Sequence, residues 1–193
     1  SAISFSSSTI KICSLILLLL NFRHSFHMLL QNTPEEKYQE KREALGKMLK
    51  EVFEMGSEQD TGSRIAVVLL KAQELGLNTC WVALTYGKSA ASVLDGEKEI
   101  CVISLGYGKT QGVPHKNKPI EKLCNYSENL PDWFLQGMRA AMLAPTATNQ
   151  QKFRFELLED GSLKISRGLG FYSKMDLGIV KYHFELGSGK KIF

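Results

Sequence analysis

The chain has 193 residues, of which 44% are hydrophobic and 23% are charged. These values exclude a disordered or low-complexity chain, because the apolar content is large enough to build a core. No apolar run approaches the roughly 18 residues that read as a membrane-spanning helix. The net charge of +4 is modest and spread along the sequence, so we expect neither a nucleic-acid nor a membrane partner.

The cysteines and histidines give little support to a metal or redox site. No two cysteines have the CxxC spacing, and the four histidines do not cluster with them. We therefore expect no metal ligands, and reduced cysteines in a cytoplasmic protein. Cys80 is expected to be a small buried apolar side chain. His183, in the middle of a predicted helix, is expected on the surface or facing a partner.

Residues 1–27 differ in composition from the rest of the chain. A Ser-rich stretch is followed by Lys11 and the apolar run 12–20, which together have the outline of a signal peptide. No Ala-x-Ala cleavage site follows, and Met28 would be a sensible start. We interpret residues 1–27 as a foreign-looking leader and residues 28–193 as the domain. The alternative is that the run forms a short buried helix or strand.

Two helices are predicted in the first half of the domain. Thr33-Pro34-Glu35-Glu36 has the pattern of a capped helix start, and the 3–4 spacing of apolar residues continues to Gly56. A second helix carries its apolar face over 65–75 and ends at Gly76. Residues 77–84 form a short extended or helical piece.

Strands and helices alternate in the second half. Residues 100–105 are apolar on both faces, which predicts a central strand that the glycines after Leu105 interrupt. A helix follows over 131–143, then a polar loop over 144–151. A hairpin turns at Asp160-Gly161. The last helix, over 173–186, is expected to be capped by Ser173 with Asp176 and closed by Gly187. The predicted fold class is α+β, with a central mixed or antiparallel sheet flanked by helices.

Several segments together resemble the nitroreductase family of FMN enzymes. Residues 144–153, APTATNQQKF, are similar to that family's A-P-S/T-x-x-N-x-Q-P-W segment. Residues 76–81, GLNTCW, resemble its G-L-G-T-x-W segment, and 105–108 with 114–119 resemble its L-G-Y-P segment and the K-x-R that follows. Residues 176–179, DLGI, resemble its D-x-G-I/V helix start. The match spans roughly residues 62–189.

The order of these segments and one missing motif set the chain apart from common nitroreductases. Here the A-P-T-containing segment follows the G-L-N-T-x-W segment, whereas common members have the reverse order. This order resembles a branch with rearranged segments. The R-R-S-x-R stretch that in this family holds the FMN phosphate does not occur near this N-terminus, and Lys41-Arg42 lies inside a predicted helix.

The resemblance implies a set of cofactor-binding residues whose chemistry suits FMN. Asn149 and Gln151 carry amide donors and acceptors for the polar edge of the ring. Lys116 and Lys118 supply cations for the phosphate, with Lys118 standing where the family prefers arginine. Glycines at the strand end let the backbone approach a ligand closely. The full candidate set is Pro145, Thr146, Asn149, Gln151, Gly106, Tyr107, Gly108, Lys116 and Lys118. No catalytic acid or base is expected, because the cofactor carries the chemistry.

The activity implied by the resemblance is that of an FMN-dependent oxidoreductase. Such enzymes pass hydride from NAD(P)H through the flavin to a small organic acceptor, and they are typically homodimers. The alternative is a flavin-free relic or ligand-binding protein on the same fold, without catalysis, since fold does not fix function. The alternative for Asn149 and Gln151 is that they only close a loop, and the alternative for Lys116 and Lys118 is a solvated surface run.

Overall fold

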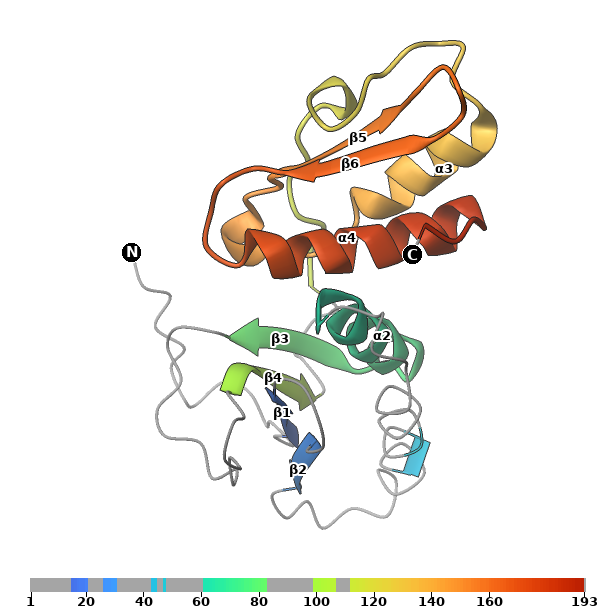
Figure 1. Ribbon diagram of the computed structural model, residues 1–193. Coiled ribbons are helices and arrows are strands. Elements are labelled where there is room, and N and C mark those ends of the chain that lie inside the picture. The colour runs from blue at the N-terminus through green and yellow to red at the C-terminus, as the bar shows by residue number, and fades with distance from the viewer. Residues whose placement is uncertain are drawn as a thin grey trace. The chain divides into compact units, whose positions relative to one another are not determined.

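The computed structural model describes residues 15–20, 26–30, 43, 44, 47, 61–82, 99–106 and 112–192 (Figure 1). The chain divides into two compact units. Unit 1 comprises residues 1–55 and 68–113, and unit 2 comprises residues 56–67 and 114–193. The helix expected from Thr33 lies outside the described residues, except that residues 43, 44 and 47 are helical.

Unit 1 contains an antiparallel four-stranded sheet with the order β2-β1-β4-β3. Its strands are β1 (Leu15–Leu20), β2 (Phe26–Leu30), β3 (Asn78–Val82) and β4 (Glu99–Gly106). β4 has a neighbour on each side, which confirms the predicted central strand. Cys101, Val102 and Ile103 of β4 are buried, as the apolar pattern on both faces of that strand requires.

Residues 15–20 of the apolar run near the start of the chain form a strand, β1. β1 pairs with β2 on one side and with β4 on the other, so that Leu17 lies opposite both Met28 and Ile103. The expected boundary between a leader and a domain, after residue 27, falls inside β2. These pairings show that residues 15–20 form a strand within a sheet. The division of the chain after residue 27 stays a prediction.

Helix α2 (Thr61–Glu74) confirms the predicted second helix, although it begins earlier than its apolar face. Gly76 follows its last turn, and the φ of 70° at this glycine is the left-handed conformation that glycine adopts at little cost. Residues 61–67 of α2 belong to unit 2. There Ser63 donates a hydrogen bond to the Gly178 carbonyl at 3.3 Å.

Unit 2 is built from a hairpin and two long helices. β5 (Phe153–Leu157) and β6 (Leu163–Arg167) form the predicted antiparallel hairpin. α3 (Asp132–Ala141) and α4 (Ser173–Ser188) lie side by side against it (Figure 1). Each helix buries one face. The buried residues of α3 follow the 3–4 spacing of an amphipathic helix: Phe134, Gly137, Met138 and Ala141.

Aromatic side chains form the centre of unit 2. Phe155 of β5 stacks on Phe184 of α4, with ring centroids 4.6 Å apart and planes 17° from parallel. Phe134 of α3 meets Phe184 edge-on at 5.7 Å. All three rings are fully buried. Aromatic pairs of this kind contribute about 0.5–1.5 kcal/mol beyond their buried area, so this cluster joins both helices to the hairpin.

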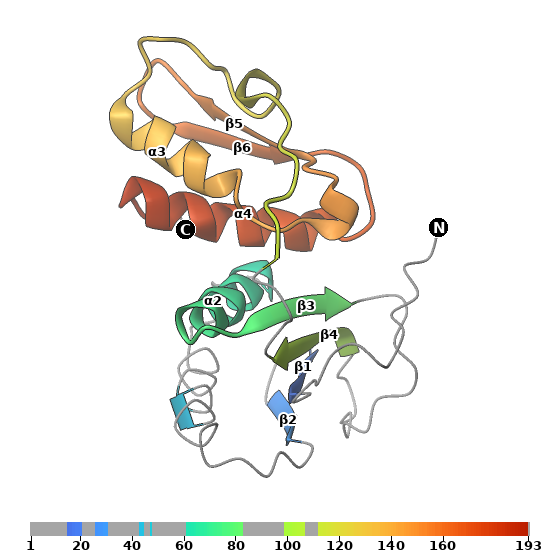
Figure 2. The same ribbon diagram turned by 180° about the vertical axis from the view of Figure 1, so that it is seen from behind.

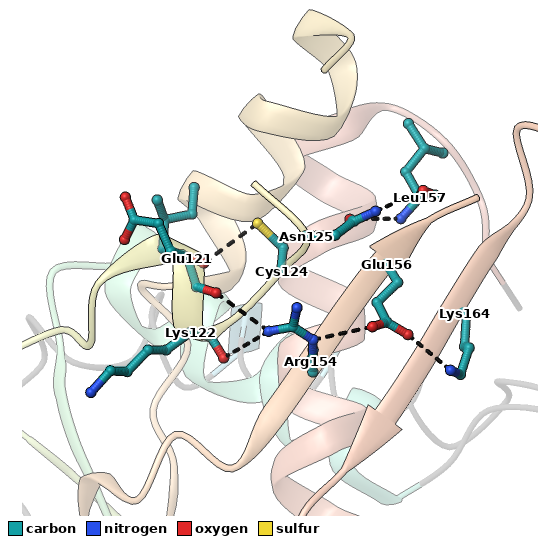
Figure 3. Close-up of polar contacts among 9 residues, drawn as sticks. Glu121, Lys122, Cys124, Asn125, Arg154, Glu156, Leu157 and Lys164 are labelled. Carbon is teal, nitrogen blue, oxygen red and sulfur yellow. Dashed lines mark hydrogen bonds and ion pairs between the residues drawn. The ribbon is translucent and has the colours of Figure 1, made fainter. Parts of the chain in front are cut away.

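The short helix η2 (Ile120–Lys122) and the residues that follow it are hydrogen-bonded to β5 (Figure 3). The Asn125 side chain donates to the Leu157 carbonyl at 2.8 Å and accepts from the Leu157 N–H at 3.0 Å. Cys124 forms a parallel bridge with Phe155, and the Arg154 guanidinium donates to the Glu121 and Lys122 carbonyls. These contacts fix the position of the irregular segment 114–119 that precedes η2.

Both ends of α4 differ from the sequence-based prediction. Its N-cap is Tyr172, in a left-handed conformation and without a side-chain cap, and Ser173 instead accepts a hydrogen bond from Arg167. The closing residue is Gly189, with φ 66°, rather than Gly187. Gly187 lies within the helix, where a Cβ atom would come within 2.4 Å of Ala140 Cβ. The α+β class itself is confirmed.

Candidate functional site

The polar loop between α3 and β5 has an unusual backbone. Pro145 is half-buried and Thr146 is buried, and a short helix, η3 (Ala147–Asn149), follows them. Thr148, Asn149 and Gln151 all have positive φ, at 52°, 52° and 43°. Left-handed backbone costs roughly 1–2 kcal/mol for a residue other than glycine, so the surrounding contacts must stabilise the loop.

The carbonyl oxygen of Lys116 is a focus of those contacts. It accepts hydrogen bonds from Gln151 Nε2 at 2.7 Å and from Asn149 Nδ2 at 2.9 Å. Gln151 Nε2 also donates to Asn149 Oδ1 at 2.7 Å. Both hydrogens of the Gln151 amide are thereby used, and this residue is only 3% exposed. The predicted residues Asn149, Gln151 and Lys116 are therefore brought together by direct hydrogen bonds.

Lys118 completes the connection between segment 114–119 and the loop. Its ammonium donates to the Gln150 carbonyl at 2.7 Å and to the Gln151 carbonyl at 3.1 Å. Its backbone N–H donates to Gln151 Oε1 at 2.9 Å. Figure 2 shows segment 114–119 passing the end of the hairpin at which β5 starts. We call this set of hydrogen bonds between residues 116–118 and 149–151 the loop clamp.

A buried carboxylate supports the other side of the loop. Asp176 of α4 is 3% exposed, and it accepts from the Ala147 N–H at 2.9 Å and from Gln150 Nε2 at 2.6 Å. Burial raises the pKa of Asp176, and the hydrogen bonds from Ala147 and Gln150 oppose that rise. The sequence predicts a cap for α4 at this position. The structure instead joins α4 to the loop through Asp176.

The segment before α4 is fastened to the same loop. Gln150 Nε2 donates its second hydrogen to the Phe171 carbonyl at 2.7 Å, and Lys152 Nζ donates to the Leu169 carbonyl at 2.7 Å. Leu169 and Phe171 are 89% and 82% exposed. Neither residue could be identified from the sequence. Their backbone carbonyls make the contacts while their side chains are exposed, and such an arrangement leaves no periodic apolar pattern.

His115 contains a polar atom without a partner. Its Nδ1 is buried and has no hydrogen-bond partner in the part of the chain that the structure describes. Its Nε2 lies 3.4 Å from the Leu143 carbonyl, a long contact. An unsatisfied ring nitrogen beside Lys116 is a feature that a bound polar group would relieve. In the sequence His115 is one position of a motif and has no role of its own.

Gly106, Tyr107 and Gly108 are not among the described residues of unit 2. Gly106 ends β4 in unit 1, opposite Asn78 of β3. Tyr107 and Gly108 lie outside the described residues. Lys116 has an exposed side chain, whereas that of Lys118 is half-buried. Their roles toward a cofactor stay predictions.

Two expectations about reactive side chains are wrong. His183 is 7% exposed rather than on the surface, and it belongs to the buried residues of α4 together with Ile179, Val180 and Phe184. Its Nδ1 lies 2.8 Å from the Ile179 carbonyl, and burial lowers its pKa. Cys80 is exposed rather than buried. The other residues of β3, which is the last strand of its sheet, are half-buried.

Metal-binding clusters and membrane-spanning helices are both missing from the described ranges. No group of three or more His, Cys, Asp or Glu residues there could hold a metal ion. None of the helices there combines the length and apolar character that crossing a bilayer needs. Cys80, Cys101 and Cys124 are not in disulfides.

The comparisons with known proteins agree with the resemblance. A family model described as "Putative TM nitroreductase" matches residues 37–188, which include the whole loop clamp. A solved structure described as a putative nitroreductase from Thermotoga maritima is 27% identical and superposes with a TM-score of 0.50. The match covers 68% of this chain and 57% of that one, so the chain spans little more than half of that relative's length. No curated protein sequence matches this chain.

Proposed function

We propose that this chain, which belongs to the putative nitroreductase family, is an FMN-dependent oxidoreductase. In this proposal NAD(P)H is the electron donor, a small organic molecule is the acceptor, and the active form is a homodimer. The match over residues 37–188 carries the proposal, because it includes both the loop 144–151 and segment 114–119. The same two segments are held together by the loop clamp.

The groups around the loop clamp fit a ligand with a phosphate and a polar ring edge. The Lys116 ammonium is exposed and provides a point charge for a phosphate. Asn149 is exposed and, within the described residues, uses one amide hydrogen and one lone pair, which leaves one of each for a ligand. The unsatisfied Nδ1 of His115 adds a further polar atom.

Within the proposal, this chain's residues bind and orient the cofactor rather than react. Lys116 neutralises the phosphate, Asn149 pairs with the polar edge of the ring, and Pro145 and Thr146 stiffen the loop that carries Asn149. When bound, FMN supplies the hydride and electron transfer itself. Asp176 and Gln150 hold the loop from the α4 side, so that Asn149 is in place before the ligand arrives.

The proposal is tested by titrating the purified protein with FMN and following the quenching of flavin fluorescence. We expect saturation at one FMN per chain and an absorption spectrum shifted from that of free flavin. Asn149→Ala should weaken binding by about tenfold, the effect of one lost hydrogen bond. Absence of quenching at micromolar protein would overturn the proposal.

One observation favours the second candidate, a flavin-free ligand-binding protein of the same fold. Both amide hydrogens of Gln151 are used within the chain, so this side chain has only acceptor capacity left for a ring edge. Under this alternative the exposed groups near the loop clamp bind a ligand without redox chemistry. This alternative would be supported if the protein bound simple phosphate compounds but did not quench the fluorescence of FMN or of riboflavin.

A further inference from the structure

We propose that Lys118 is a positioning residue, whose ammonium holds the main chain of the loop, and that the phosphate cation of this segment is Lys116. This inference rests on the proposed function and assigns different roles to two lysines that stand two positions apart. The sequence pattern alone treats them alike, as a pair of cations for the phosphate.

The hydrogen bonds of Lys118 are directed at the protein itself. Its ammonium has three donors, and two of them are taken by the carbonyls of Gln150 and Gln151. Hydrogen bonds from a charged donor are shorter and about twice as strong as neutral ones. If this ammonium moved to a phosphate, the carbonyls of Gln150 and Gln151 would lose their hydrogen bonds from Lys118.

The backbone that Lys118 holds is the strained part of the loop. Asn149 and Gln151, on either side of Gln150, have φ of 52° and 43°. The carbonyl oxygens of Gln150 and Gln151 both lie within hydrogen-bond distance of the Lys118 ammonium. Two carbonyl dipoles that point toward the same place repel each other unless a positive charge lies between them. The positive charge of Lys118 therefore stabilises the conformation that displays Asn149.

Lys116 is placed in the opposite way. Its backbone carbonyl is the acceptor for Asn149 and Gln151, whereas its side chain is exposed and has no hydrogen bond or ion pair within the described residues. Replacing the Lys116 side chain leaves its carbonyl, and hence the loop clamp, intact. The two lysines can therefore be separated by substitution.

The experiment compares Lys118→Met with Lys116→Met, each titrated with FMN and with riboflavin, which has the ring but no phosphate. We expect Lys118→Met to weaken both ligands by the same factor of about ten or more, because it disturbs the loop. Lys116→Met should weaken FMN by about tenfold and leave riboflavin unchanged. Selective loss of FMN in Lys118→Met, or no change in either ligand, would overturn the inference.

A third variant separates the charge from the hydrogen bonds. Lys118→Gln keeps a donor for one of the carbonyls but carries no charge, so it should recover part of the affinity for both ligands. If Lys118 contacts the phosphate, Lys118→Gln should instead be as poor for FMN as Lys118→Met and as good for riboflavin as the unaltered protein. This result would contradict the positioning role.

Amide hydrogen exchange in the ligand-free protein keeps this test independent of flavin binding. Exchange of the Asn149, Gln150 and Gln151 amides should be faster in Lys118→Met, unchanged in Lys116→Met, and unaltered in β5 and α3 in both variants. Equal exchange at all these amides in the three proteins would refute the role of Lys118. If the unaltered protein binds no flavin but shows this exchange pattern, the proposed function fails while the positioning role stands.

Discussion

Gln150 Nε2 donates a hydrogen bond of 2.6 Å to the buried Asp176 carboxylate, and through it the loop before β5 rests on the first turn of α4. The Ala147 N–H donates to the other carboxylate oxygen at 2.9 Å. These donors compensate only part of the cost of burying the carboxylate, because burial still raises the Asp176 pKa. This balance has a measurable consequence for stability.

The first prediction concerns the contribution of Asp176 to the free energy of unfolding as a function of pH. A carboxyl group with a raised pKa binds its proton more tightly in the folded protein, so its contribution to stability is present below the unfolded pKa of about 3.9. That contribution is lost as pH rises from there through the folded pKa. We expect the free energy of unfolding of the unaltered protein, relative to Asp176→Asn, to fall across this window. Urea titrations of both proteins from about pH 3.5 to about pH 7 measure it, and a relative gain with rising pH would contradict the prediction.

The second prediction concerns His183, whose contribution to the free energy of unfolding decreases on acidification, whereas that of Asp176 increases. Burial lowers its pKa, so the folded protein disfavours the protonated ring. Its contribution is present above the unfolded pKa of about 6.5 and is lost as pH falls through the folded pKa. We expect His183→Gln to flatten the stability profile between about pH 7 and about pH 5. An unchanged slope in this variant would show that His183 is protonated without penalty.

The third prediction concerns the packing of α3 against α4. A Cβ atom on Gly187 would lie 2.4 Å from Ala140 Cβ and 2.8 Å from the Gln136 carbonyl. Gly187→Ala should therefore destabilise the protein by about 1–3 kcal/mol, although alanine is the better helix former. The denaturation midpoint measures this loss. Ala140→Gly added to Gly187→Ala removes the nearer contact, and we expect it to recover part of the loss.

The fourth prediction concerns the residues before Met28. β1 lies between β2 and β4, so removing it takes an interior strand from the sheet of unit 1. A variant that begins at Met28 should lose cooperative unfolding of unit 1 and tend to aggregate through the exposed edge of β4. Light scattering and thermal unfolding measure both effects. A soluble variant with an unchanged unfolding midpoint would support the interpretation of residues 1–27 as a leader.

Much of unit 2 could be predicted from local patterns. The spacing of Phe134 and Met138 gives the buried face of α3, and the alternation around Phe153 and Phe155 with the turn at Asp160-Gly161 gives the hairpin. These features follow from periodicity and turn chemistry, which depend on neighbouring residues.

The details of the site could not be predicted in the same way. Asp176 has the spacing of a helix cap, but its partners are Ala147 and Gln150, which are distant in sequence. The two lysines of segment 114–119 are alike in sequence, and only the approach of the Gln150 and Gln151 carbonyls distinguishes Lys118. Such roles are set by tertiary contacts.

The central claim, that this chain is a flavin-dependent oxidoreductase, is tested most directly by adding NADH or NADPH to the FMN-saturated protein without oxygen. We expect the visible absorbance of the oxidised flavin to bleach with one of the two nucleotides and to return when a nitroaromatic or quinone acceptor is added. FMN that binds to the protein but keeps its oxidised spectrum with both nucleotides would contradict the claim.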